Sequence, residues 1–386
     1  MKRLPVPTEP SFTSALRDER LSARIGTWLG VCFGLCFLTG LISHWYYLPD
    51  PPVLPPTRPV WGYRVTQGVH VLSGIASIPL LLVKLWSVYP RLFAEVPFRQ
   101  VRALAVHLAE RASIAVLVAA SIFQLVTGLA NASQWYPWSF SFRGTHYALA
   151  WVAIGALLVH VAVKLPAIRA AYAEPLPEPP TEDAAATTGG PSRRTILRTA
   201  LLSSSVAVLA AAGSTVPLLR RVSVFGVRSG EGPQGVPVNK SAAAADVLGS
   251  AMDPAFRLTV ANGGREVALS RADLEALRQR THELPIACVE GWSASGRWTG
   301  VRLADLLDLV AAPADATVRV RSLQQDGPFR VTVIPAPFAR DPLTLLALGL
   351  NGEDLAIDHG FPCRLIAPNR PGVMQTKWVT RIEVLA

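Results

Sequence analysis

The sequence predicts a multidomain protein: an all-α transmembrane bundle of four helices, a fifth transmembrane helix, and then an α+β domain. Four long apolar runs lie before residue 165, and a shorter one covers about residues 199–219. After that run the composition is that of a globular domain. Over all 386 residues, 50% are hydrophobic and only 17% are charged, which is too apolar for an ordinary soluble enzyme.

The four long runs are each near the ~20 residues that a helix needs to cross ~30 Å of hydrocarbon. They cover residues 24–45, 65–88, 101–130 and 145–165. Basic residues gather before the first run, between the second and third, and after the fourth, and by the positive-inside rule these sides face the cytoplasm. The net charge of +10 therefore comes mostly from the basic residues that flank the membrane spans on the cytoplasmic side. Because the basic residues are dispersed, we expect no nucleic-acid partner.

These runs and the composition between them divide the chain into five parts. Residues 171–192 are rich in proline, glutamate and glycine, cannot bury a core, and are expected to form a disordered cytoplasmic linker. The expected parts are a cytoplasmic N-terminus at 1–23, a four-helix membrane domain at 24–170, the linker at 171–192, a fifth helix at 193–220 and a C-terminal domain at 237–386.

The fifth run is preceded by a pair of arginines. Ser192, Arg193 and Arg194 stand before a moderately apolar segment, which resembles a twin-arginine export signal. A paired arginine before a span is also what the positive-inside rule predicts, so this alternative stays open. On the first interpretation, the twin-arginine translocation machinery exports a folded C-terminal domain. We then expect a multi-pass protein of the bacterial inner membrane, with that domain on the outer face.

Five of the seven histidines lie in or at the ends of the first four runs, where ionisable groups are costly and usually functional. His146 and His160 lie on one helix face, about 21 Å apart along the axis. With the expected topology, His70 is level with His146 near the outer surface, and His107 is level with His160 near the inner one. Two bis-histidine haems would fit between these helices. His44 is either a bystander or a substitute outer ligand.

Residues 20–170 resemble the cytochrome b561 and formate-dehydrogenase gamma-subunit type of membrane cytochrome. The first run is similar to the family's Arg-x-x-His-Trp opening followed by Thr-Gly, with Thr27 where the family has histidine. The resemblance implies one or two b haems, and the inner one depends on whether His107 replaces the absent ligand. The triplet at 39–41, Thr-Gly-Leu, recurs at 127–129 and predicts similar small-residue contacts between helices. Cys32 and Cys36 are interpreted as packing residues.

The C-terminal domain alternates short Val- and Arg-rich strands, expected at 317–323 and 329–334, with helices expected at 271–280 and 303–310. This pattern is typical of an α+β domain with a mixed or antiparallel sheet. Ser270 and Asp273 are placed to form a capping box at the start of the first of these helices.

Three sequence blocks of this domain carry its chemistry. The run 284–292 delivers Cys288 to a Gly-Trp loop, and the runs 296–303 and 358–378 follow in order. Together they resemble the sulfite-oxidase family of molybdopterin oxidoreductases. The resemblance implies that Cys288 is the thiolate ligand of molybdenum, although a Cys288–Cys363 disulfide is an alternative. It further implies that the pterin and its phosphate are bound by Asn239, Ser322, His359, Arg364, Gln375, Thr376 and Lys377.

The residues after the metal cysteine bear on the substrate. Val-Glu-Gly-Trp follows Cys288, where animal and plant sulfite oxidases have an arginine-bearing run, and this is closer to the periplasmic methionine-sulfoxide reductase type. We expect a membrane-anchored enzyme that exchanges electrons between an external molybdenum site and the quinone pool through b haems, acting on a small S- or N-oxide or oxyanion. The alternatives are a sulfur-oxyanion dehydrogenase with reversed electron flow and a non-catalytic haem protein with an external binding domain.

Overall fold

The structure is a computed structural model that describes residues 17–48, 51–93, 100–174, 192–226 and 232–385. Contacts divide the chain into two compact units. One comprises Met1–Leu41 and Val69–Leu209, and the other comprises Ile42–Gly68 and Ala210–Ala386. Most of the expected linker, residues 175–191, lies outside the described residues.

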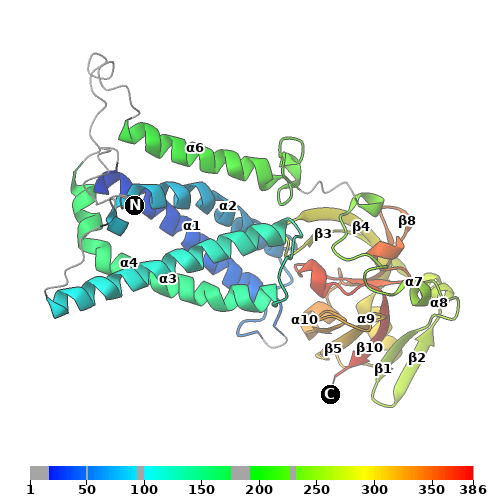
Figure 1. The fold of residues 1–386 in the computed structure, drawn as a ribbon. Coiled ribbons are helices and arrows are strands. Elements are labelled where there is room, and N and C mark those ends of the chain that lie inside the picture. The colour runs from blue at the N-terminus through cyan, green and yellow to red at the C-terminus, as the bar shows by residue number, and fades with distance from the viewer. Residues whose placement is uncertain (1–16, 49–50, 94–99, 175–191, 227–231, 386) are drawn as a thin grey trace, which may run out of the picture. The chain divides into compact units, whose positions relative to one another are not determined.

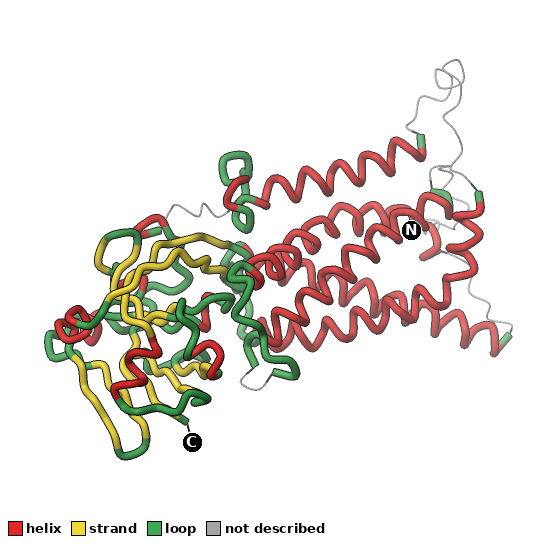
Figure 2. Tube along the Cα trace, turned by 180° about the vertical axis from the view of Figure 1, so that it is seen from behind, coloured by secondary structure: helices red, strands yellow, loops and turns green. Residues whose placement is uncertain are grey.

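The described residues up to Ala212 include five long helices, one for each apolar run (Figure 1). All five are long and apolar enough to cross a membrane, which is consistent with a membrane-anchored protein. The strands, drawn in yellow in Figure 2, all belong to the C-terminal domain, and the described residues before it form helices and loops. The long helices are α1 (Glu19–Trp45), α2 (Gly62–Val88), α3 (Val101–Ala132), α4 (Phe142–Ala173) and α6 (Arg193–Ala212).

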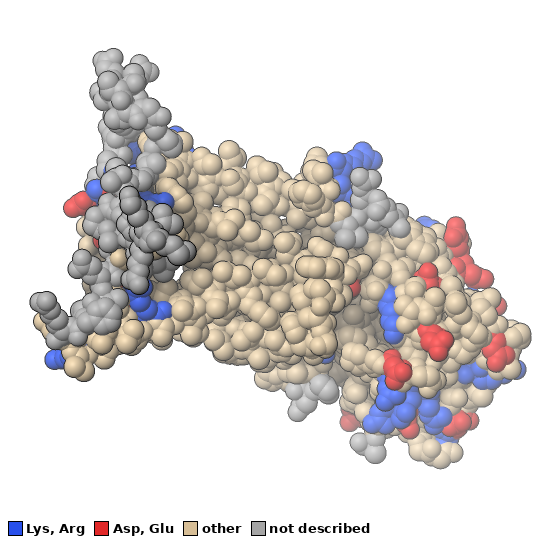
Figure 3. Space-filling model, viewed as in Figure 1, with Lys and Arg blue, Asp and Glu red and all other residues tan. Residues whose placement is uncertain are grey.

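The outer surface of these helices is apolar. Leu82, Leu158 and Leu202 are each more than 60% exposed, and the visible face of the helices in Figure 3 carries few charged side chains along their length. Polar groups instead point inward, where they satisfy one another. For example, the Ser204 hydroxyl of α6 donates to the Ala76 carbonyl of α2 at 2.9 Å. This distribution suits helices surrounded by lipid.

Helix α6 ends at Ala212, short of residue 220 where the sequence pattern placed its end. The chain turns at Gly213, where a Cβ atom would lie 2.8 Å from the Cα of Arg220, so that only glycine fits. Pro217 then begins a single 3₁₀ turn, Pro217–Leu219, because its ring cannot continue an α-helix.

The C-terminal domain contains two five-stranded sheets and short helices, which confirms the α+β prediction. The first sheet has the order β2-β1-β10-β5-β6 and is mixed, since β1 pairs parallel with β10 and the other pairs are antiparallel. Its strands are β1 (Leu258–Asn262), β2 (Arg265–Leu269), β5 (Val318–Ser322), β6 (Val331–Ile334) and β10 (Val379–Val384).

The second sheet is antiparallel, with the order β3-β4-β7-β8 and with β9 paired to β7. Its strands are β3 (Gln279–Ala287), β4 (Ser293–Arg302), β7 (Leu345–Leu350), β8 (Glu353–Asp354) and β9 (Arg364–Ile366). The short helices of the domain are α7 (Leu248–Ala251), α8 (Arg271–Ala276), α9 (Leu303–Leu309) and α10 (Ala336–Ala339).

Helix α8 has the expected start but not the expected end. The capping box of Ser270 and Asp273 is present. The helix stops at Ala276, whereas the sequence pattern extended it to 280. Gln279 explains the difference, because its side-chain amide donates to the carbonyls of Leu274 and Leu277 at 2.8 and 2.9 Å and its backbone already belongs to β3.

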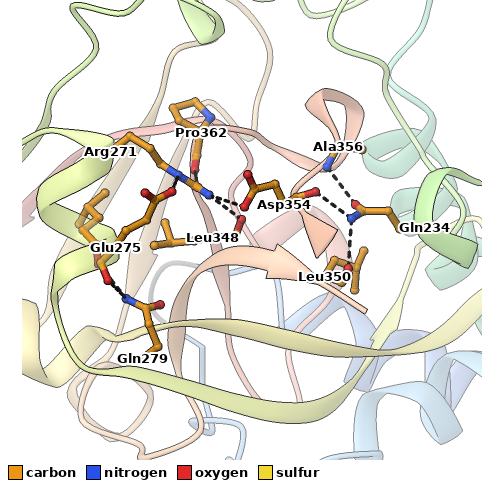
Figure 4. Close-up of polar contacts among 10 residues, drawn as sticks. Gln234, Arg271, Glu275, Gln279, Leu348, Leu350, Asp354, Ala356 and Pro362 are labelled. Carbon is orange, nitrogen blue, oxygen red and sulfur yellow. Dashed lines mark hydrogen bonds and ion pairs between the residues drawn. The ribbon is translucent and has the colours of Figure 1, made fainter. Parts of the chain in front are cut away.

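Side chains brace the β7–β8 hairpin and the loop that follows it (Figure 4). Arg271 donates to the Pro362 carbonyl and pairs with the Asp354 carboxylate at 3.0 Å. Gln234 donates to the carbonyls of Leu350 and Asp354 at 3.1 and 2.8 Å. The loop between β8 and β9 is thereby fixed at both ends, and this loop leads directly into Arg364.

Residues 42–68 fold as part of the second unit. Arg58 makes two hydrogen bonds to the carboxylate of Asp341, at 2.9 and 3.1 Å. Asn369 accepts from the backbone amide of Tyr63 and donates to the Pro56 carbonyl at 2.7 Å. Because polar contacts of this kind need fixed partners on both sides, this segment is an integral part of the C-terminal unit.

Candidate functional site

Cys288 lies directly after β3, in a tight turn that ends at Trp292. The Cys288 amide donates to the Trp292 carbonyl at 2.9 Å, and the Gly291 amide donates to the Cys288 carbonyl at 3.1 Å. Gly291 has a φ of 93°, a conformation that favours glycine. The Cys288 side chain is 1% exposed. Burial raises the pKa of its thiol well above the usual range, so its thiolate needs a cation or a metal as partner.

Three buried cations form no salt bridge in the described part of the chain: Arg364, Arg370 and Lys377, although the charge of Asp358 acts on Lys377. Burial lowers the pKa of Arg364 to about 9, that of Arg370 to about 10 and that of Lys377 to about 7. A charged Cys288 would raise the pKa values of Arg364 and Lys377, which places both near the thiol. Burying a charge without a partner costs several kcal/mol. This group of buried cations is therefore suited to binding an anionic ligand.

Backbone carbonyls and aromatic rings hold these cations in place. Arg364 donates to the His359 carbonyl at 3.2 Å, and its guanidinium lies 5.3 Å from the centroid of the Trp298 ring. Lys377 donates to the carbonyls of Lys240 and Asp358. These partners fix the position of each cation without neutralising its charge.

The other residues predicted to bind the pterin surround these cations. His359 is buried, and its Nε2 donates to the Pro233 carbonyl at 2.7 Å, since a carbonyl can only accept. Burial, together with the charge of Arg364, lowers the pKa of His359 to about 4, so the ring is neutral at pH 7. The Ser322 hydroxyl donates to the Lys377 carbonyl at 2.8 Å.

The remaining predicted residues lie on both sides of this group. Gln375 donates to the Arg370 carbonyl at 2.9 Å, and Thr376 shares a 2.7 Å hydrogen bond with the Thr332 hydroxyl. Asn239 is half-buried and precedes Lys240, whose carbonyl accepts from Lys377. The structure thus gathers the predicted residues from four separate stretches of the chain.

Several buried polar atoms here have no hydrogen-bond partner among the described residues. They are Arg364 Nε, Arg370 Nε, Gln375 Oε1 and Ser293 Oγ. Buried polar atoms in folded proteins almost always have a hydrogen-bond partner. A group of such atoms without partners therefore indicates that a polar ligand binds here. Ser293 lies in the strand directly after the Cys288 turn, and the other three lie in the run 364–375.

Arg370 was not among the sequence-predicted site residues. The motif gave no indication that this arginine is buried, because an arginine in a Pro- and Gly-rich loop is usually exposed. Its burial is visible only in the fold, where its guanidinium donates to the Val333 carbonyl at 3.1 Å and lies over the Phe338 ring.

The alternative disulfide does not form. Cys288 and Cys363 are both free thiols. Cys363 donates to the Val379 carbonyl at 3.2 Å and packs in a core cluster to which both sheets contribute, whereas Cys288 belongs to a different core cluster together with Trp298.

Residues 246–386 match the family model described as "Oxidoreductase molybdopterin binding domain". This segment is therefore similar to molybdopterin-binding oxidoreductase domains. The match supports the prediction that the chain is an oxidoreductase. Molybdopterin carries a phosphate and polar pterin edges. These are the groups that the buried cations and the buried polar atoms without hydrogen-bond partners could bind, and Cys288 could supply a sulfur ligand to the metal. The residues present therefore fit this cofactor.

Parts of the chain are also similar to curated proteins. A putative protein-methionine-sulfoxide reductase subunit, YedZ1, of Azospira oryzae is 35% identical over 112 residues, 29% of this chain and 42% of the relative. The mitochondrial sulfite oxidase of Drosophila melanogaster is 31% identical over 155 residues, 33% of this chain and 27% of the relative. Sulfite oxidase of Arabidopsis thaliana is 35% identical over 115 residues, 25% of this chain and 29% of the relative. The chain thus spans less than half the length of each.

In the helical unit, the structure brings His70 of α2 and His146 of α4 together. Their ring centroids lie 6.3 Å apart, with the planes inclined at 76°. His70 Nδ1 lies 2.8 Å from the Cys36 carbonyl, which can only accept, so this nitrogen carries the hydrogen. His146 Nδ1 lies 3.2 Å from the Thr127 hydroxyl, which already donates to the Phe123 carbonyl at 2.7 Å. Both imidazoles therefore keep Nε2 as the unprotonated nitrogen.

A glycine lies against each of these histidines, and at Gly40 a side chain would clash with the ring. A Cβ at Gly40 would lie 2.8 Å from Cε1 of His70, and a Cβ at Gly128 would lie 3.8 Å from Cε1 of His146. Gly40 and Gly128 are the central residues of the two Thr-Gly-Leu triplets, so each triplet places its glycine against one member of the histidine pair.

The inner histidines are not brought together in the same way. No ring contact joins His107 of α3 and His160 of α4 in the described residues. The His107 Nε2 atom is buried and has no hydrogen-bond partner there. Thr27, at the position of the family's histidine, donates to the Ala23 carbonyl and accepts from the Tyr172 hydroxyl. His44 lies in the last turn of α1.

Proposed function

We propose that this chain is a membrane-anchored, molybdopterin-dependent oxidoreductase in which a molybdenum site at Cys288 exchanges electrons with a quinone or quinol through a b haem between His70 and His146. The observation that carries the proposal is a buried thiol together with buried cations that form no salt bridge among the described residues, within a segment that matches a molybdopterin-binding family model. When bound, the molybdenum cofactor supplies two-electron oxygen-atom chemistry.

The residues of the domain have distinct roles in this proposal. Cys288 provides the soft sulfur ligand of the metal. Arg364 and Lys377 neutralise the phosphate, and the fixed fork of Arg364 aligns it. The neutral His359 and the polar side chains of Asn239, Ser322, Gln375 and Thr376 hydrogen-bond to the pterin edges. Since these cations lose their burial penalty when the anion binds, cofactor binding and folding of the site are coupled.

The histidine pair supports a haem rather than another metal. Two imidazoles alone cannot complete a zinc site, and the described residues hold no group of three or more His, Cys, Asp or Glu that could hold a metal ion. A haem needs only axial ligands from the protein, because the porphyrin supplies the others. The Nδ1 hydrogen bonds orient both rings and leave Nε2 for the iron. A second haem at His107 and His160 remains a prediction.

The substrate proposed here is a small S- or N-oxide or oxyanion. The names of two relatives support this substrate class, because one is a putative subunit of a protein-methionine-sulfoxide reductase and the other is a sulfite oxidase. The sulfite oxidase names also favour the second candidate, a dehydrogenase of a small sulfur oxyanion in which electrons flow from molybdenum to the haem.

A spectroscopic experiment tests the proposal and its direction. The full chain is purified in detergent from a host with an intact molybdopterin pathway, and its haem is reduced stoichiometrically. Addition of dimethyl sulfoxide, methionine sulfoxide or trimethylamine N-oxide is expected to reoxidise the haem. If instead sulfite reduces the oxidised haem, the dehydrogenase is correct. A haem that responds to neither class of compound contradicts both.

Export of the C-terminal domain tests the proposed location. Arg193 and Arg194 begin α6. A twin-arginine signal does not accept a Lys-Lys pair, whereas the positive-inside rule does, because it counts only charge. The double variant Arg193→Lys, Arg194→Lys is therefore expected to leave the C-terminal domain protected from protease added to spheroplasts. The matched control, Arg198→Lys, should leave it exposed. Protease-accessible domain in the double variant would disprove the export signal.

A further inference from the structure

The turn that carries Cys288 is held by residues from outside the matched domain. The Gln67 side-chain amide, near the start of α2, donates to the Val289 carbonyl at 3.0 Å. The Thr215 hydroxyl, after the end of α6, donates to the Gly291 carbonyl at 2.6 Å. The Ser293 amide, at the end of the turn, donates to the Ser214 carbonyl at 2.8 Å. All of these residues belong to the second compact unit.

These contacts are buried and closely packed. Gln67 is 6% exposed and Thr215 is 5% exposed. A Cβ atom at Gly68 would lie 2.5 Å from the methyl group of Thr215, so glycine at 68 is what lets Thr215 approach the turn. Buried polar groups are costly unless paired, and here each donor meets a carbonyl of the turn.

The turn's own hydrogen bonds define only part of its conformation. They join the Cys288 amide to the Trp292 carbonyl and the Gly291 amide to the Cys288 carbonyl, while Gln67 and Thr215 hold the Val289 and Gly291 carbonyls from outside the turn. Rotation of the peptide plane of either carbonyl would change the backbone angles beside Cys288 and therefore the direction of its thiol. A metal–thiolate bond depends on that direction, since ligands must be held close to their productive geometry.

We propose that Gln67 and Thr215 are positioning residues of the molybdenum site. Together they hold the backbone of the Cys288 turn and so set the direction in which the Cys288 sulfur points. This inference rests on the proposed function, because it assumes that Cys288 binds molybdenum. It makes the segments flanking the membrane helices a working part of the site. Gln67 also precedes His70 by three residues in α2, about 4.5 Å along the helix axis.

The test uses the full chain in detergent and the electron paramagnetic resonance spectrum of Mo(V), generated by partial reduction with dithionite. Gln67→Leu and Thr215→Val remove the donors at nearly constant volume. We expect both variants to retain molybdenum and iron but to shift the Mo(V) g values, because the sulfur–metal angle changes. Thr215→Ser, which keeps a hydroxyl, should restore the wild-type spectrum.

Two matched controls remove hydroxyls that bond only within their own segments. Thr66 donates to the Gly62 carbonyl, and Ser205 of α6 donates to the Leu201 carbonyl. Thr66→Val and Ser205→Ala should leave the g values unchanged. Wild-type g values in Gln67→Leu and Thr215→Val, or equal shifts in the controls, would overturn the positioning role. If Gln67→Leu does not fold, the Thr215→Val and Thr215→Ser pair decides. Wild-type protein without molybdenum would instead contradict the proposed function.

Discussion

Replacement of Cys288 by serine is expected to abolish molybdenum-dependent turnover while the haem spectrum persists. Serine is nearly the same size, but its hydroxyl is a hard, weakly acidic ligand in place of a soft thiolate. Burial raises the pKa of the Cys288 thiol, and it disfavours the deprotonated form of a serine hydroxyl at this position in the same way. The loss should reach about a thousandfold, as for removal of an essential catalytic group. Turnover with the dyes or quinols that reduce the wild-type protein measures it.

The matched control is Cys363→Ser. Cys363 is equally buried, and a serine hydroxyl can donate to the same Val379 carbonyl. This variant should retain molybdenum and turnover, so loss in Cys288→Ser alone identifies the metal ligand. Unchanged turnover in Cys288→Ser would refute the molybdenum site at this residue.

Replacement of His146 by alanine is expected to remove the b haem held with His70 and to leave the molybdenum content unchanged. The variant loses one axial ligand, and the Thr127 hydroxyl that orients it cannot replace it. The α band of the reduced pyridine haemochrome should fall by the amount due to one haem per chain. Quinol-dependent turnover should fall with it, because electrons then lack a route to the molybdenum site.

His44→Ala is the control for this experiment, since His44 is the alternative outer ligand. It should retain the full haem absorbance. If His44→Ala loses the haem and His146→Ala keeps it, the ligand assignment is wrong, although a haem would still be present.

The helices were predictable because a helix that crosses lipid must be long and apolar, and a long apolar run can be seen directly in the sequence. Their ends were not, because they depend on single contacts. Gly213 ends α6 through its closeness to Arg220, and Gln279 ends α8 by bonding to carbonyls of the preceding turn. Similarly, the strands could be recognised from their residues, but the parallel pairing of β1 with β10 joins the two ends of the domain and leaves no local pattern.

The candidate site was predictable where a motif carries it and not where the fold assembles it. Cys288, His359 and Lys377 lie in blocks whose order resembles a known family. Arg370 lies in the same block, but only the fold buries it. Gln67 was hidden in an apolar run, where a polar residue near the helix end was the only available signal. The depth of the histidines in the membrane predicted two pairs. Depth does not determine which way a side chain points around the helix axis, and among the described residues the histidine rings in contact are those of His70 and His146.

The most direct test of the central claim is the amount of molybdenum and iron per chain, measured by elemental analysis of the detergent-purified protein made in a host with an intact molybdopterin pathway. The account predicts one molybdenum and at least one iron as b haem, with one iron for the His70 and His146 site alone and two if His107 and His160 bind a second haem. Iron without molybdenum, or molybdenum without iron, would contradict a chain that joins the two centres.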